Sequence, residues 1–162
     1  MLIIGHDSVG AGVADPIPAM NEAIQMAMTA LSSSTLTEAW NTRRPEAVAA
    51  LYAPDGARTV MGYPGGRIEG REALAEHVRE IMTACPDCAL TVRSEGVAAD
   101  GALTLEWTFR ATQQADYGPI PGKGQELELN GASVIRMDGG LIAEENVYWD
   151  GGVLMAAAGM LG

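Results

Sequence analysis

The stretch ALTLEWTFRATQ, residues 102–113, alternates apolar and polar side chains over its whole length. Apolar residues occupy the odd positions from Leu103 to Ala111, so they share one face of an extended chain, while threonines and charged residues take the other face. This period of two predicts a β-strand with one buried face. The same alternation returns in residues 89–97, 126–137 and 141–150.

Short turn sequences lie between these predicted strands. Residues 100–101 read Asp-Gly, and residues 138–140 read Asp-Gly-Gly. Such pairs suit the tight connections of β-hairpins, because glycine and aspartate accept the backbone angles that these turns need. The second half of the chain therefore predicts an antiparallel sheet.

The first half has helical spacing instead. A helical pattern runs from Pro18 to Trp40 with an interruption at residues 32–35. A second helix is predicted from Pro45 to Tyr52, where the sequence Pro-Asp-Gly at residues 54–56 ends it.

A third helix and some shorter elements complete the pattern. Residues 58–61 predict a short strand and residues 62–66 a loop. The third helix opens at residues 70–72 and ends before Pro86. Residues 151–161 predict a short closing helix.

Helices followed by long antiparallel strands indicate an α+β fold in which the helices pack on one face of a curved sheet. The length of 162 residues fits one domain. We assign residues 18–162 to that domain, and residues 1–17, rich in Gly, Ala, Asp and Pro, to a mobile N-terminal arm.

Composition limits the partners. Ten Lys and Arg against 21 Asp and Glu give a net charge of −11, which repels nucleic acid and anionic membrane surfaces. The chain has two cysteines, no evident signal peptide and no apolar run of the roughly 20 residues that a membrane span requires. We expect a soluble, cytoplasmic protein.

Five segments resemble the SnoaL-like polyketide (ester) cyclases of the nuclear transport factor 2 superfamily, and together they extend the likeness over residues 36–160. They are EAWNTRRPEAVAALYAPDGA (38–57), GREALAEHV (70–78), CPDCALTVRSEGV (85–97), WTFRATQ (107–113) and GASVIRMDGGLIAEENVYWD (131–150). The resemblance implies a cone-shaped α+β barrel of the nuclear transport factor 2-like or cystatin-like kind, often a homodimer, with a deep pocket between sheet and helices.

The family's usual catalytic side chains are absent at the matching positions. Where the resemblance implies the Arg and Asp residues of epoxide hydrolases, this chain has Trp107, Phe109 and Val147. Where polyketide cyclases carry a His and an Asp, it has Gln113 and Ser133. The segment that holds the general-base Asp of ketosteroid isomerases reads Met-Gly-Tyr-Pro here, at residues 61–64.

Alternation in the last strand places Glu145 on the same face as Val147 and Trp149. A single carboxyl group on an apolar face is desolvated, and this raises its pKa and suits it to acid/base work. The alternative is that the register slips near the strand end and leaves Glu145 in solvent.

Two more residues are candidates for catalysis. His77 lies on the apolar side of the third helix, where it serves as base or proton shuttle, or only hydrogen-bonds at the helix edge. Tyr63 lies in the loop at the cavity mouth, where its hydroxyl stabilises an oxyanion or only packs under the loop.

The remaining candidates line the pocket. Gln113 and Ser133 face inward by alternation and are predicted to orient the substrate, and Tyr117 lies in the connection 115–124 that covers the entrance or is an ordinary exposed loop. The predicted substrate-binding residues are Trp40, Trp107, Phe109, Gln113, Tyr117, Ser133, Val147 and Trp149.

The sequence contains no phosphate-binding glycine loop, dinucleotide fingerprint or zinc-protease motif, so we expect no metal and no cofactor. The leading hypothesis is a cofactor-independent cyclase or isomerase that transfers protons on a hydrophobic, oxygenated, polyketide-like substrate. The alternative is a non-catalytic ligand-binding or dimerisation module of the same fold.

Overall fold

The computed structural model describes residues 31–162. The predicted N-terminal arm, and the helical pattern from Pro18 up to residue 30, lie outside these residues. Three helices come early in the described chain, namely α2 (Ser33–Asn41), α3 (Pro45–Ala49) and α4 (Arg71–Ala84), and α5 (Gly151–Ala157) comes last. The strands are β1 (Tyr52–Val60), β2 (Gly66–Glu69), β3 (Ala89–Val97), β4 (Leu103–Gln113), β5 (Gln125–Asp138) and β6 (Leu141–Trp149).

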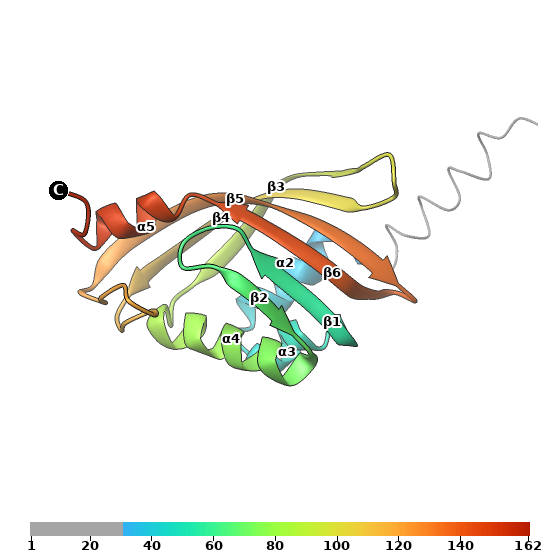
Figure 1. Cartoon of the computed structure of the whole chain (residues 1–162), viewed down its shortest axis with the longest axis horizontal. Coiled ribbons are helices and arrows are strands. Elements are labelled where there is room, and N and C mark those ends of the chain that lie inside the picture. Colours follow the sequence, from blue (N-terminus) through green and yellow to red (C-terminus); the bar gives the residue numbers. More distant parts are fainter. Residues whose placement is uncertain (1–30) are drawn as a thin grey trace, which may run out of the picture.

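The six strands form one curved sheet in the order β2-β1-β6-β5-β4-β3. Helices α2, α3 and α4 lie on one side of it, and α5 packs near the start of β5 (Figure 1). The α+β class is therefore confirmed. The sheet is open, with β2 and β3 at its edges, so the expected barrel is a half-closed cone rather than a closed cylinder.

Two expectations from the sequence are wrong, one about the sheet and one about the second helix. β1 runs parallel to β6, so the sheet is mixed and not wholly antiparallel. The second helix ends at Ala49, and Tyr52 already begins β1. The sequence Pro54-Asp55-Gly56 is a bulge inside this strand, not a turn that ends a helix, because the pairing with β6 shifts between Tyr52 and Ala57.

Helix α4 is built as its sequence predicts. It follows Gly70 and ends at Cys85, directly before Pro86. Leu74, Val78 and Met82 repeat at helical spacing and are buried against the sheet.

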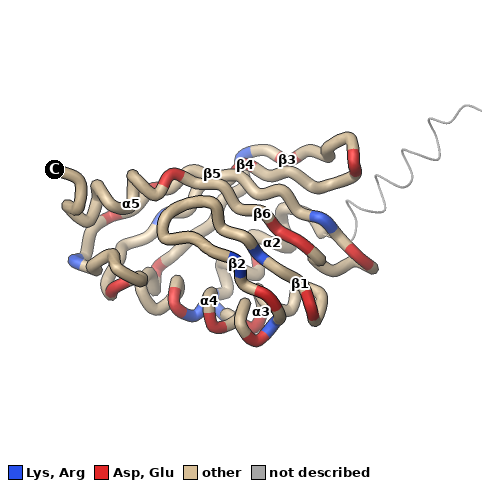
Figure 2. Tube along the Cα trace, viewed as in Figure 1, with Lys and Arg blue, Asp and Glu red and all other residues tan. Residues whose placement is uncertain are grey.

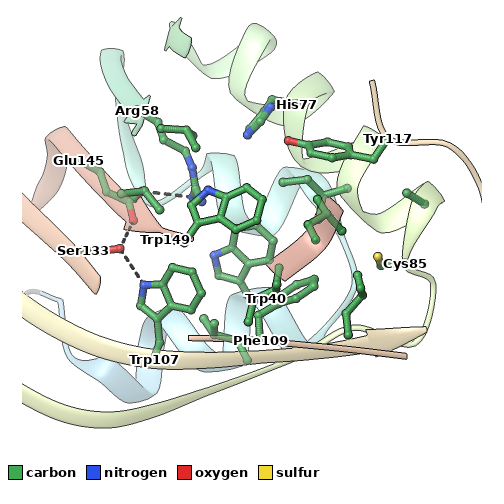
Figure 3. A pocket seen from close by; sticks show the side chains of 18 of the residues that line it. Trp40, Arg58, His77, Cys85, Trp107, Phe109, Tyr117, Ser133, Glu145 and Trp149 are labelled. Carbon is green, nitrogen blue, oxygen red and sulfur yellow. Dashed lines mark hydrogen bonds and ion pairs between the residues drawn. The ribbon is translucent and has the colours of Figure 1, made fainter. Parts of the chain in front are cut away.

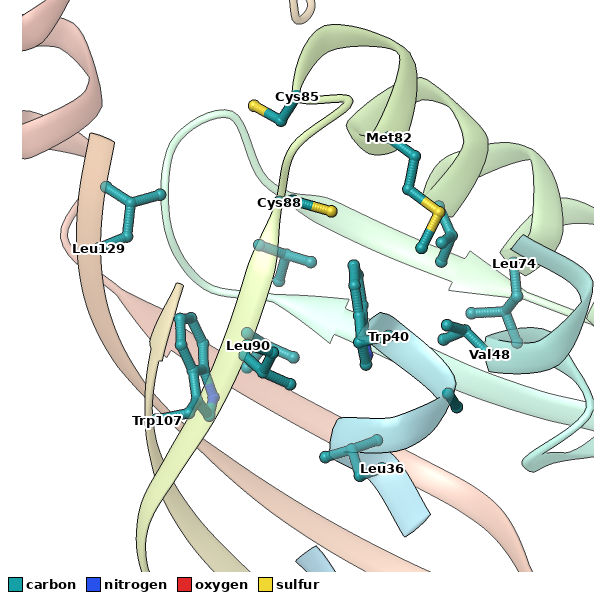
Figure 4. Close-up of a cluster of buried hydrophobic side chains, with 14 of the residues drawn as sticks. Leu36, Trp40, Val48, Leu74, Met82, Cys85, Cys88, Leu90, Trp107 and Leu129 are labelled. Atoms are coloured by element: carbon teal, nitrogen blue, oxygen red, sulfur yellow. The ribbon is translucent and has the colours of Figure 1, made fainter. Parts of the chain in front are cut away.

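The core lies between this helix layer and the sheet. Trp40 from α2 is at its centre, with Leu74 and Met82 on one side and Leu90 of β3 on another (Figure 4). Asn41 fixes α2 to the edge strand: its side chain donates to the carbonyl of Leu90 (3.0 Å) and accepts from the amide of Leu90 (2.8 Å).

Charged residues lie at the strand ends and over α3 and α4, where acidic residues stand next to arginines (Figure 2). Arg79 of α4 pairs with Glu76 on its own helix and with Glu46 of α3 (2.8 Å). These pairs are exposed and screened by solvent, so each contributes little to stability. Within residues 31–162 no helix is both long enough and apolar enough to cross a membrane.

Candidate active site

A cavity lies between the sheet and the helices. The cavity has a volume of about 100 Å³. Its wall is mostly apolar and includes side chains from α2, α4, α5 and strands β1, β3, β4, β5 and β6. Predominantly apolar walls with a few polar groups are typical of small-molecule sites.

Ten of the eleven residues that the sequence proposed for the site line this cavity. They are Trp40, His77, Trp107, Phe109, Gln113, Tyr117, Ser133, Glu145, Val147 and Trp149. Strand alternation correctly placed Gln113, Ser133 and Glu145 on the inward face, but at the start of β6 it failed, because the pairing with β5 shifts there and Ile142 is buried. The role of each residue in binding or catalysis is a separate question and stays a prediction.

Tyr63 is the exception. Its side chain is 46% exposed, and it is not part of the cavity wall formed by residues 31–162. The backbone of Tyr63 packs against Gly151 at the start of α5, which leaves the ring outside the cavity. The prediction that Tyr63 donates to an oxyanion in this cavity is not supported by its position.

Two glycines make room for the indole rings of the cavity wall. Gly131 of β5 pairs with Trp107 of β4, and the Trp107 ring occupies the space where a Cβ of residue 131 would stand. The Trp149 ring lies against Gly62 in the same way. A side chain at either position would push the indole out of place.

Glu145 is 2% exposed and is held by three donors, so the expectation of an isolated carboxyl group is wrong. The hydroxyl of Tyr52 donates to Oε2, and Nη1 of Arg58 donates to the same oxygen at 3.2 Å. The hydroxyl of Ser133 donates to Oε1 at 2.9 Å (Figure 3). Glu145 is thus the acceptor of a buried ion pair.

The direction of the hydrogen bond at Ser133 follows from its neighbour. Nε1 of Trp107 lies 3.1 Å from the Ser133 oxygen, and an indole N–H can only donate. Ser133 therefore accepts from Trp107 and gives its own hydrogen to Glu145. The hydrogen and one lone pair of its hydroxyl are therefore used, and Ser133 holds Glu145 in place; its role in orienting a substrate stays a prediction.

Burial, and then the negative charge of Glu145, raise the pKa of Tyr52 above its usual range, so its phenol stays protonated. Burial is the largest single influence and would lower the pKa of Arg58, but Glu145, Tyr52 and Tyr117 together outweigh it and raise the pKa above the ordinary value. Arg58 is a permanent cation inside the fold. Its guanidinium carbon lies 5.3 Å from the centre of the Trp40 ring, at cation–π distance.

Gln113 is fully buried, and its amide is also engaged by the protein. Nε2 donates to the carbonyls of Ala115 and Ile120, both at 3.1 Å, and Oε1 accepts from Gln125 at 3.0 Å. The two donors of the amide are therefore used. Gln113 fastens the connection 115–124 to the sheet, and its role in orienting a substrate stays a prediction.

His77 differs from these engaged groups. Its Nε2 is enclosed and has no hydrogen-bond partner among residues 31–162. Burial, together with the positive charge of Arg58, lowers the pKa of His77 to about 4. The imidazole is neutral at physiological pH and carries a free ring nitrogen in the cavity wall.

Tyr117 stands beside His77. Its ring is half-buried, and its hydroxyl points toward the imidazole (Figure 3). Burial raises the pKa of this phenol, so it remains protonated. The backbone around it is fixed by paired hydrogen bonds between Tyr117 and Ile120 (2.9 and 3.0 Å).

Sequence analysis missed Tyr52 and Arg58. Tyr52 was assigned to a helix, and Arg58 was placed in a short strand without a face. The available signal was the spacing of Arg58 and Val60, which share a strand face with period two. In the structure Arg58 and Val60 line the cavity, and Arg58 lies opposite Glu145 in the parallel pairing of β1 and β6.

Neither cysteine is arranged for chemistry. Cys85 and Cys88 are free and buried, and burial raises the pKa of Cys85 to about 12, so its thiol is not ionised. In the described part of the chain, no three His, Cys, Asp or Glu side chains gather where they could hold a metal ion.

Comparison with known proteins identifies the family of this chain. The model of the SnoaL-like domain matches residues 34–145. The chain belongs to this family. A search of curated proteins gives no match.

Solved structures support the same architecture. A putative polyketide cyclase, IdmH from Streptomyces antibioticus, is 22% identical, with a TM-score of 0.64 over 84% of this chain and 98% of its own. A phenazine biosynthesis-related protein from Pseudomonas aeruginosa is 14% identical, with a TM-score of 0.68 over 88% and 93%. A hypothetical protein from Catenulispora acidiphila with a ketosteroid isomerase-like fold is 20% identical, with a TM-score of 0.67 over 78% and 91%. At these identities the likeness shows the fold alone.

Proposed function

We propose that the protein is a cofactor-independent enzyme that transfers a proton on an apolar, oxygen-bearing small molecule held in the cavity. The outcome is a cyclisation or an isomerisation. Membership of the SnoaL-like family and the likeness to a putative polyketide cyclase support the substrate class. A homodimer and a cytoplasmic location stay predictions.

One observation carries the proposal: the unpartnered Nε2 of His77 in the wall of an apolar cavity. An enclosed polar atom without a partner costs roughly 1–3 kcal/mol. Buried polar atoms without a partner are rare in folded proteins, and a catalytic role is one of the reasons for keeping one. A ligand that brings an acidic C–H to this nitrogen supplies the missing partner.

The proposed step balances as follows. Nε2 of His77 takes a proton from a carbon next to a carbonyl group, and the C–H electron pair moves to the carbonyl oxygen to give an enolate. In an isomerisation the imidazolium returns the proton at another carbon. In a cyclisation the enolate carbon attacks a second carbonyl of the same molecule, and the new alkoxide takes the proton from the imidazolium.

Glu145 has no part as base in this proposal. Both its oxygens accept hydrogen bonds from Tyr52, Arg58 and Ser133. A proton acceptor needs a free lone pair directed at the substrate, and His77 offers one more readily.

The test is exchange of α-hydrogens. A panel of phenyl ketones and 1,3-diketones is incubated with the protein in D₂O, and loss of the α-hydrogen signal is followed by ¹H NMR. Because general-base catalysis contributes about 10²- to 10⁴-fold, His77→Gln should reduce the protein-dependent rate by about that factor. Glu72→Gln, an exposed change on the same helix, is the matched control and should leave the rate unchanged.

Unchanged exchange in His77→Gln would show that another group is the base and would contradict the proposal. Here the variant's fold is checked by its methyl NMR spectrum, so that loss of exchange is not loss of structure.

The alternative function is a non-catalytic binding protein. The observation in its favour is that Glu145, Ser133 and Gln113 are all engaged by other protein groups, so residues 31–162 place no free carboxylate in the cavity. The same panel discriminates: ligands that bind with micromolar affinity but show no protein-dependent exchange would favour this alternative.

A further inference from the structure

Residues 31–162 contain two buried side-chain polar atoms without a hydrogen-bond partner, and both belong to the wall of the same cavity. One is Nε2 of His77 on α4. The other is Nε of Arg58 on β1 (Figure 3). An N–H of a guanidinium can only donate, so this second atom requires an acceptor.

Two contacts with other side chains hold the guanidinium of Arg58 in place. Nη1 donates to Glu145 at 3.2 Å, and the Trp40 ring lies under the group at 5.3 Å. Nε and Nη2 form the remaining edge, and neither donates to any residue that the structure describes. Two parallel N–H groups on one edge are the arrangement that binds two oxygens of one planar group.

We propose that this edge of Arg58 is the oxygen-binding site of the cavity and that it accepts a planar group with two neighbouring oxygens, such as an enolised 1,3-dicarbonyl. This deepens the function proposed above, because it gives the enolate formed at His77 a donor for its oxygen.

The charges support such an occupant. Arg58 and Glu145 together carry no net charge, and His77 is neutral. When a proton moves from a neutral ligand to His77, the new imidazolium balances the new enolate. The total charge of the buried site is therefore zero before and after the step, which avoids the high cost of an unpaired charge in an apolar cavity.

Glu145 is then a positioning residue. It holds Arg58 in place, and it is held in turn by Tyr52 and by the chain Trp107–Ser133. All of these bonds lie on the sheet, so they fix the guanidinium before a ligand arrives. Nε of Arg58 is enclosed by its neighbours, and we expect side chains to adjust when the ligand oxygens reach it.

The test compares two ligands that differ by one carbonyl group, 1-phenylbutane-1,3-dione and 1-phenylbutan-1-one. In the wild-type protein we expect the dione to bind about 10- to 100-fold more tightly, as hydrogen bonds to a charged donor allow. Arg58→Lys keeps the charge but loses the two-pronged edge, and the preference should fall to less than about threefold. Arg67→Gln, an exposed arginine of β2, is the control and should keep the preference.

A measurement on the wild-type protein covers the case in which Arg58→Lys does not fold. The ¹H–¹⁵N signal of the Arg58 side-chain Nε–H should shift on addition of the dione and stay in place with the monoketone. An equal preference in Arg58→Lys, or a side-chain signal that the dione leaves unmoved, would overturn the assignment. Binding in His77→Gln is measured as well, so failure of the proton-transfer proposal and failure of this one give different results.

Discussion

The polar groups on the two walls of the cavity differ in their hydrogen bonding. On the sheet, Glu145 accepts from Tyr52, Arg58 and Ser133, so its oxygens are fully engaged. On the helix side, His77 has an enclosed nitrogen with no partner among the described residues. Arg58 belongs to both patterns, since one nitrogen is bound to Glu145 and another has no partner.

This difference distinguishes polar groups that stabilise the fold from polar groups that are available to a ligand. A buried polar group that is fully hydrogen-bonded is accounted for by the protein itself. A buried polar group that lacks a partner costs stability in the isolated protein, and a ligand can recover that cost. Burial and residue type alone would have ranked Glu145 above His77, whereas the hydrogen bonds favour His77 and the free edge of Arg58.

The largest expected effect comes from breaking the sheet wall. Glu145→Gln leaves the Arg58 charge buried without a counter-charge, and removal of one partner of a buried pair costs about 3–5 kcal/mol of unfolding free energy. Urea denaturation measures this loss of unfolding free energy. The control is Glu144→Gln, whose carboxylate pairs with Arg67 at the surface; solvent screens that pair, so its loss should cost much less than the loss of the buried one. Equal costs for the two neighbours would contradict the difference between the walls.

The next effect belongs to His77 and depends on pH. Its pKa is lowered to about 4 in the folded protein, against about 6.5 when unfolded, so between these values only the unfolded state binds the proton. The unfolding free energy therefore decreases as pH falls from about 6.5 to about 4, by roughly 3 kcal/mol from this group, and changes no further below that. Denaturation of wild type and His77→Gln across this range isolates the contribution. Parallel curves for the two proteins would be evidence against a depressed pKa.

A smaller effect distinguishes two tyrosines. Tyr52→Phe removes a donor to a buried carboxylate and should cost about 1.5–3 kcal/mol. Tyr117→Phe removes a hydroxyl that donates to no described residue, so it should change stability by about 0.5 kcal/mol or less. Thermal and urea unfolding of the pair measure both. A larger loss in Tyr117→Phe than in Tyr52→Phe would reverse the comparison.

Much of the fold could be predicted because its signals are local. The ends of β3, β4, β5 and β6 lie within one residue of the alternating segments, since a half-buried strand needs period two. The start of β1 was wrong because Pro54, Asp55 and Gly56 usually indicate a turn, and only the neighbouring strand turns them into a bulge. The parallel pairing of β1 with β6 joins distant segments, and no local pattern reports it.

For the site, too, local features could be predicted from the sequence and contacts between distant segments could not. Inward direction follows from strand alternation, so Glu145, Ser133 and Gln113 were found from the sequence. Their partners were not, because Arg58 meets Glu145 only through the pairing of β1 with β6. Whether a polar side chain is engaged or free depends on such contacts, and a residue's identity does not determine it.

The most direct test of the account is an NMR titration of the His77 imidazole in the wild-type protein, assigned by comparison with His77→Gln because the chain has one other histidine, His6. The account predicts that His77 remains neutral down to about pH 4 and that its ring signals shift when 1-phenylbutane-1,3-dione binds. A ring that titrates near 6.5, with signals that the ligand does not change, would contradict it.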